Sequence, residues 1–202
     1  MEGRAILRKT TAFRALVAGC CALFALLGNV AEALGDPIDT CGYRQAGLSM
    51  PAYQVSSSEV GHPWRALYGY CLLGGQRFVL HQDWALSYLD GDDVGSAPGG
   101  EGIGIGTDLF VRWKADWRPS LIPYIDAGVG IQYAARNPFP ADGSRWMFTL
   151  HGGAGWLIPM KKNRQATVAV RYLHMSNAGL TGENSGYDVI HLILGMRWGS
   201  SR

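Results

Sequence analysis

The sequence predicts an all-β protein, an eight-stranded antiparallel transmembrane β-barrel, and three observations lead to this prediction. Apolar side chains alternate with small or polar ones along several segments, each about as long as a strand that crosses a membrane. Short turns alternate with longer connections that are rich in Gly, Asp, Asn or Pro. Tryptophans recur near segment ends and faces, as in the aromatic girdles of membrane barrels.

The expected strands follow one another without a linker, a repeat or a low-complexity tract, so the chain is expected to form one barrel domain. Eight strands are the smallest closed barrel of this kind. We place the strands at residues 44–56, 63–74, 76–89, 102–117, 120–134, 145–157, 164–176 and 187–199. The expected short, periplasmic turns are Gly74-Gly75, Arg118-Pro119 and Pro159–Asn163. The expected long, external connections are Asp90–Glu101, Ala135–Ser144 and Asn177–Gly186.

The first 33 residues read as a signal peptide, which leaves residues 34–202 for the barrel. Basic residues precede an apolar run at 15–27, and the Ala-Glu-Ala sequence at 31–33 has the pattern of a cleavage site. A lipoprotein signal is the alternative, because the sequence at 17–20 resembles a lipobox. Arg14 interrupts the apolar run just before it, and a longer apolar stretch follows Cys20, so cleavage after Ala33 is favoured.

Charge gives no indication of a nucleic-acid partner. The first 33 residues hold four of the 18 basic residues and two of the 16 acidic ones, so 14 of each remain in the mature chain. A net charge near zero leaves no basic field for nucleic acid.

Two cysteines, Cys41 and Cys71, remain after the signal peptide is removed. In an exported, oxidising setting they can form a disulfide, or Cys71 can serve as a small apolar residue on a strand face. No cluster of Cys, His and Asp has the spacing of metal ligands, so we expect neither a metal nor a cofactor.

The segments at 102–117 and 120–134 show which face of the barrel is polar. In the first, one face is mainly apolar and carries Ile103, Ile105, Leu109, Val111 and Trp113. The opposite face carries Gly104, Gly106, Asp108, Phe110, Arg112 and Lys114. A soluble barrel buries its apolar face, whereas a membrane barrel turns that face to lipid and lines its interior with the polar one. We assign His81, Asp83, Asp126, His151 and His191 to the same interior network.

The last two expected strands bring an acid, a base and a hydroxyl to one face. Residues i and i+2 of a strand point the same way, so His174 and Ser176 share a face with the apolar residues Val168 and Val170. A symmetric hairpin around Asn177–Gly186 places Asp188 opposite His174, where β-carbons lie about 4.5–5.5 Å apart. Ionisable groups on a lipid-facing wall are costly, so this trio predicts a function, and its types fit Ser-His-acid catalysis.

The sequence from His174 to Leu180, His-Met-Ser-Asn-Ala-Gly-Leu, followed by Asn184, Gly186 and Asp188, resembles the signature of the lipid A 3-O-deacylase (PagL) family. That resemblance implies an eight-stranded barrel in the outer membrane of a Gram-negative bacterium. Its substrate would be lipid A, the anchor of lipopolysaccharide in the outer leaflet, which the enzyme cuts at the ester of the 3 position.

The resemblance also implies roles for single residues. Ser176 would be the nucleophile, His174 the base and Asn177 the oxyanion-hole donor, with the backbone N–H near Gly179 assisting. Asp188 would be the acid, where well-studied members carry Glu, which is one methylene longer. Two alternatives stay open: a non-catalytic small barrel with a structural or adhesive role, and an esterase that acts on other acyl lipids.

Overall fold

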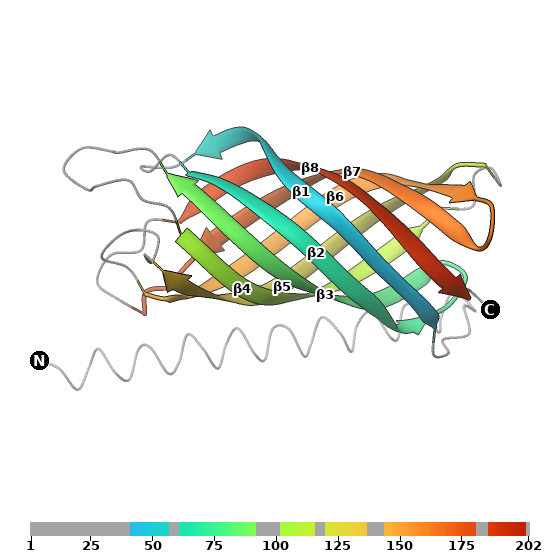
Figure 1. The fold of residues 1–202 in the computed structure, drawn as a ribbon, viewed down its shortest axis with the longest axis horizontal. Coiled ribbons are helices and arrows are strands. Elements are labelled where there is room, and N and C mark those ends of the chain that lie inside the picture. Colours follow the sequence, from blue (N-terminus) through green and yellow to red (C-terminus); the bar gives the residue numbers. More distant parts are fainter. Residues whose placement is uncertain are drawn as a thin grey trace, which may run out of the picture.

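The structure, a computed structural model, describes residues 41–56, 61–91, 102–115, 120–136, 144–180 and 186–200. The expected signal peptide lies outside these residues. Eight strands form one closed barrel in which each strand pairs antiparallel with its neighbours in sequence, and the last pairs with the first (Figure 1). The strands are β1 Gly42–Ser56, β2 Gly61–Gly74, β3 Phe78–Gly91, β4 Gly102–Lys114, β5 Ile122–Arg136, β6 Trp146–Met160, β7 Arg164–Ser176 and β8 Tyr187–Ser200.

The predicted fold class and the predicted order of strands are therefore confirmed, with changes at some strand ends. β6 continues through Pro159 to Met160, so the turn before β7 is shorter than expected and consists of residues 161–163. Lys162 and Asn163 adopt φ of 62° and 52° in this turn. Two consecutive residues with positive φ match the twist of a hairpin, and this geometry lets β6 and β7 pair up to the turn. Among the described residues, no helix is long and apolar enough to cross a membrane.

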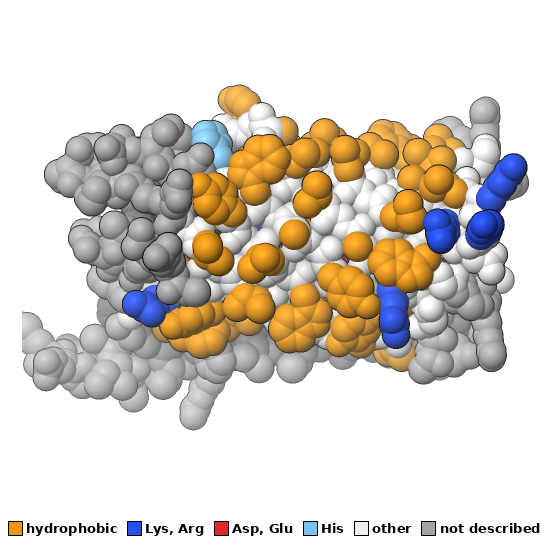
Figure 2. Space-filling view, in the orientation of Figure 1, with side chains coloured by type: hydrophobic (Ala, Val, Ile, Leu, Met, Phe, Trp, Pro, Cys, Tyr) orange, Lys and Arg blue, Asp and Glu red, His pale blue; other side chains and the backbone are white. Residues whose placement is uncertain are grey.

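The outer wall of the barrel is apolar. Large hydrophobic side chains from all eight strands are exposed there. Figure 2 shows such side chains spread over the wall, with Lys and Arg side chains toward the two ends of the barrel. Exposed tryptophans include Trp64, Trp84, Trp146 and Trp156. A wall of this kind requires lipid rather than water around it.

The interior is filled by paired charges. Arg65 and His151 both contact the Asp108 carboxylate, at 2.7 and 3.0 Å. Arg112 and Arg171 share the Asp126 carboxylate in the same way, at 3.0 and 2.9 Å. The predicted interior positions of His81, Asp83 and His191 are also confirmed, because all three side chains are buried. A network in which each buried carboxylate has an arginine partner and a second hydrogen-bond donor tolerates burial, so the polar face can form the core of the barrel.

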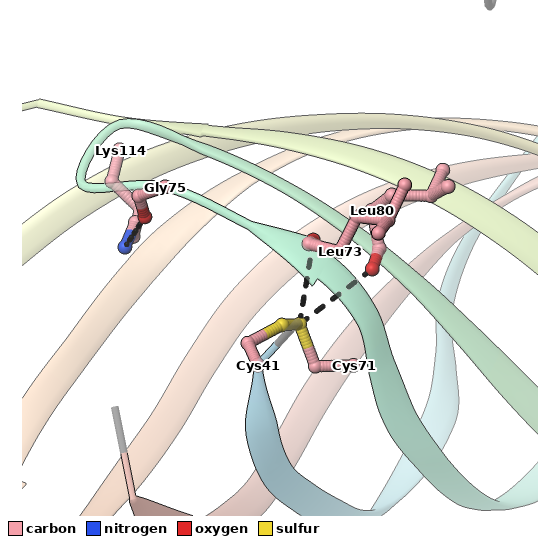
Figure 3. Close-up of a disulfide and its surroundings, with 6 residues drawn as sticks. All are labelled: Cys41, Cys71, Leu73, Gly75, Leu80 and Lys114. Carbon is pink, nitrogen blue, oxygen red and sulfur yellow. Dashed lines mark hydrogen bonds between the residues drawn. A yellow bond between two sulfur atoms is a disulfide. The ribbon is translucent and has the colours of Figure 1, made fainter. Parts of the chain in front are cut away.

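A disulfide between Cys41 and Cys71 connects the start of β1 to the end of β2 (Figure 3). Their Cα atoms lie 5.6 Å apart, a usual separation for this bond. Glycine at position 74 makes room for it, since a Cβ there would lie 2.9 Å from the Cys41 sulfur. The sequence left open whether Cys71 forms a disulfide or serves as a small apolar residue. The structure has the disulfide, and the Cys71 side chain is also buried.

Replacing both cysteines, as Cys41→Ser/Cys71→Ser, is expected to lower the free energy of unfolding by about 3 kcal/mol, because the bond closes a loop of 30 residues. Urea unfolding in detergent micelles, followed by tryptophan fluorescence, measures the change. A reductant should lower the wild-type midpoint by a similar amount and leave the double variant unaffected. A wild-type midpoint that does not respond to reductant would show that the bond contributes no stability.

Candidate active site

His174 and Asp188 meet on the outer wall, at the end of the barrel where β7 finishes and β8 starts. The two residues are direct partners in the β7–β8 register, as the symmetric hairpin predicts. Nδ1 of His174 lies 2.6 Å from Oδ1 of Asp188. The side chains are 34% and 23% exposed, so they are within reach of a molecule outside the barrel. This contact sets the orientation of the imidazole and leaves Nε2 as the nitrogen available for proton transfer.

Ser176 follows two residues later and is the last residue of β7. Its side chain is partly buried, on the same face as the His174 ring. Among the described hydrogen bonds, none joins the Ser176 hydroxyl to that ring. The structure thus places a candidate base and a candidate nucleophile two residues apart on one face of β7, with no described hydrogen bond between their side chains. Such loose geometry is common in catalytic sites without substrate.

Gly186 lies beside the side chains of His174 and Ser176, the candidate base and the candidate nucleophile. A Cβ at this position would lie 2.9 Å from Cε1 of His174 and 3.4 Å from Cβ of Ser176. The absence of a side chain on Gly186 therefore keeps the approach between the two functional groups open.

Gly186→Ala is expected to reduce ester hydrolysis by roughly 10- to 100-fold, because the added methyl group displaces the His174 ring from Ser176. Gly152→Ala is a matched control, since a Cβ on that outward-facing residue would meet no atom within 4 Å. Initial rates on an ester substrate, with folding checked by circular dichroism, make the comparison. Equal rates for both variants would show that the open space has no role.

Asn177 begins a tight turn after β7. The N–H of Leu180 donates to the backbone oxygen of Asn177 at 3.0 Å, and Ala178 and Gly179 have φ of 50° and 74°. The Gly179 N–H donates to Oδ1 of Asn177 at 2.8 Å. Because Oδ1 is the acceptor in this bond, the Nδ2 end of the buried amide is the end that can serve as a donor.

Tyr172 is a further member of the cluster that sequence reasoning missed. Its hydroxyl donates to Oδ1 of Asp188 at 2.5 Å. Strand parity puts Tyr172 on the same face of β7 as His174, where the sequence alone marks it only as part of the lipid-facing stripe. The signal that could have identified Tyr172 is its hydroxyl. Tyr172 lies two residues before the candidate base His174, and its hydroxyl is therefore close to Asp188, the partner of that base.

An apolar hollow of about 470 Å³ lies on the outer wall, mainly over β4 and β5, and reaches toward this cluster at Leu150 of β6. Its lining includes Leu109, Val129 and Leu150, and Leu150 is the β6 partner of His174. Apolar wall surface therefore extends directly from the candidate base. In the described part of the chain, no group of three or more His, Cys, Asp or Glu side chains is placed to hold a metal ion.

Comparison with known proteins gives a consistent result. A family model described as lipid A 3-O-deacylase (PagL) matches residues 52–197, which include every candidate site residue. The lipid A deacylase PagL of Bordetella bronchiseptica is 36% identical over 89 residues, covering 38% of this chain and 47% of that protein. The match thus spans about half the length of this curated relative.

Two solved structures share the barrel. The crystal structure of the outer membrane enzyme PagL has a TM-score of 0.54 and 20% identity, covering 76% of this chain and 97% of that one. Neisserial surface protein A (NspA) has a TM-score of 0.56 and 16% identity, covering 81% and 99%. At such identities the likeness shows the fold alone, and any statement about chemistry must come from the site.

Proposed function

Because the chain belongs to the lipid A 3-O-deacylase (PagL) family and is an outer-membrane β-barrel, we propose that it hydrolyses the ester-linked acyl chain at the 3 position of lipid A by a Ser-His-acid mechanism. The observation that carries this proposal is the His174–Asp188 contact beside Ser176 on the lipid-facing wall. A buried charge network elsewhere in the barrel stabilises the fold, whereas this pair is exposed toward the place where a lipid substrate lies.

In the proposed first half-reaction, Oγ of Ser176 attacks the ester carbonyl carbon while Nε2 of His174 accepts the hydroxyl proton. Asp188 stabilises the resulting imidazolium through Nδ1–H. Nδ2 of Asn177 donates to the oxyanion of the tetrahedral intermediate. Gly179 assists indirectly, because its N–H donates to Asn177 Oδ1 and holds that amide in place. The intermediate collapses, the sugar hydroxyl leaves with the proton from His174, and the acyl group remains on Ser176.

In the second half-reaction, His174 removes a proton from water, which attacks the acyl-enzyme. Collapse of that intermediate releases the fatty acid and restores the Ser176 hydroxyl. The steps use the side chains of this chain and water.

The position of the site supports a lipid substrate. β7 ends and β8 starts at the end of the barrel opposite the short turns and the C-terminus (Figure 1). With the short turns in the periplasm, this end faces the outer leaflet, where lipid A resides. The apolar hollow that begins at Leu150 offers contact for an acyl chain beside the base.

The test is incubation of the purified, folded protein with lipid A in detergent micelles, followed by mass spectrometry of the products. The proposal predicts release of one acyl chain from the 3 position. A parallel incubation with a phospholipid separates this activity from that of an esterase with other substrates. If a folded preparation cleaves phospholipid and leaves lipid A intact, the proposed substrate is wrong. If it cleaves neither, the barrel is non-catalytic under the conditions of the assay.

A further inference from the structure

Two donors converge on a single oxygen of Asp188. The Tyr172 hydroxyl donates to Oδ1 at 2.5 Å, and Nδ1 of His174 lies 2.6 Å from the same oxygen. Tyr172 and His174 are two residues apart on one face of β7, and Asp188 lies across from His174 on β8. The three side chains form one cluster on the outer wall of the barrel.

An aspartate at position 188 needs a second hydrogen-bond donor, besides His174, to keep its carboxylate in place. The Asp side chain is short, and its carboxylate must stay in line with the His174 ring on a wall that faces lipid. An ionised carboxylate in apolar surroundings is stabilised by charge-assisted hydrogen bonds, and a second donor also restricts its rotation. Tyrosine suits the place, because its ring contacts lipid while its hydroxyl reaches a polar partner.

We propose that Tyr172 is a positioning residue of this active site. It holds the Asp188 carboxylate in the orientation that accepts the hydrogen bond from His174, and it acts through Asp188 rather than on the substrate. This inference rests on the proposed function for its kinetic test, whereas its structural test is independent of any substrate.

The kinetic test is Tyr172→Phe, which keeps the ring and removes only the hydroxyl. We expect kcat for deacylation to fall by about 10-fold with KM unchanged, since a hydrogen bond to a charged group is lost. Tyr68→Phe is the matched control. Tyr68 is 45% exposed on the outer wall, compared with 37% for Tyr172, and it lies on β2, which pairs with neither β7 nor β8.

A double-variant cycle separates positioning from substrate contact. If Tyr172 acts through Asp188, Tyr172→Phe has no further effect on kcat in an Asp188→Asn background. An equal loss in both backgrounds would overturn the proposal, because the hydroxyl would then act on the substrate or the fold. Wild-type kcat in Tyr172→Phe would overturn it as well.

The structural test uses proton NMR of the isotopically labelled protein in micelles. The Nδ1–H of His174 is expected to resonate at low field in the wild type and to shift in Tyr172→Phe, but not in Tyr68→Phe. If the wild type proves inactive on lipid A, the proposed function fails while this readout still decides the role of Tyr172. An unchanged His174 resonance in Tyr172→Phe would overturn the inference.

Discussion

Ser176→Ala is expected to lower kcat for deacylation by at least about 10³-fold while the barrel folds normally. The variant removes only the hydroxyl that attacks the ester, and among the described hydrogen bonds none involves that hydroxyl, while the backbone pairing of Ser176 with Phe148 is kept. The barrel itself is stabilised by the closed strand ladder and the interior charge pairs, which this change does not touch. Rates on lipid A, with folding followed by circular dichroism, give the measurement.

Ser144→Ala provides the control for Ser176→Ala. Ser144 lies just before β6, at the same end of the barrel, and its hydroxyl accepts a hydrogen bond from the Trp146 N–H at 3.1 Å. It lies six residues before Leu150, the β6 partner of His174, and its described side-chain hydrogen bond is to Trp146, so its loss should leave kcat unchanged. Comparable activity of Ser176→Ala and Ser144→Ala would remove Ser176 from the mechanism.

His174→Ala is expected to reduce kcat by a similar factor of at least about 10³, because the proton of Ser176 then has no acceptor. The sharper expectation concerns the double variant Ser176→Ala/His174→Ala. Since the two residues act as one unit, the double variant should be no slower than either single variant. Losses that multiply would mean that the two residues act separately, and the proposed base–nucleophile pair would be wrong.

The alternation of apolar and polar residues along each strand was sufficient to predict the barrel and to predict which strand face points to the interior. In β4, the residues assigned to the interior, such as Asp108 and Arg112, are buried with partners, and Ile103 and Ile105 are exposed on the wall. A one-residue slip would have exchanged the two faces, so the signal is strong wherever one face carries charge. The pairing of His174 with Asp188 followed from the same logic, because a symmetric hairpin fixes the register across the loop.

Other features depend on contacts that no local pattern encodes. The turn at 161–163 is set by positive φ at Lys162, a residue type with no special preference for that conformation. The role of Gly186 became visible only when the His174 ring and Ser176 were placed around it. Tyr172 reads as one more aromatic residue of the wall until Asp188 is brought to its hydroxyl. In each case the information lies in three-dimensional proximity.

The measurement that tests the central claim most directly is mass spectrometry of lipid A from Gram-negative cells that express the wild type or Ser176→Ala. Both proteins must first be shown to be folded in the outer membrane. We expect lipid A to lose one hydroxyacyl chain, from the 3 position, in cells with the wild type alone. Unaltered lipid A in cells with the folded wild type, or the same loss with Ser176→Ala, would contradict it.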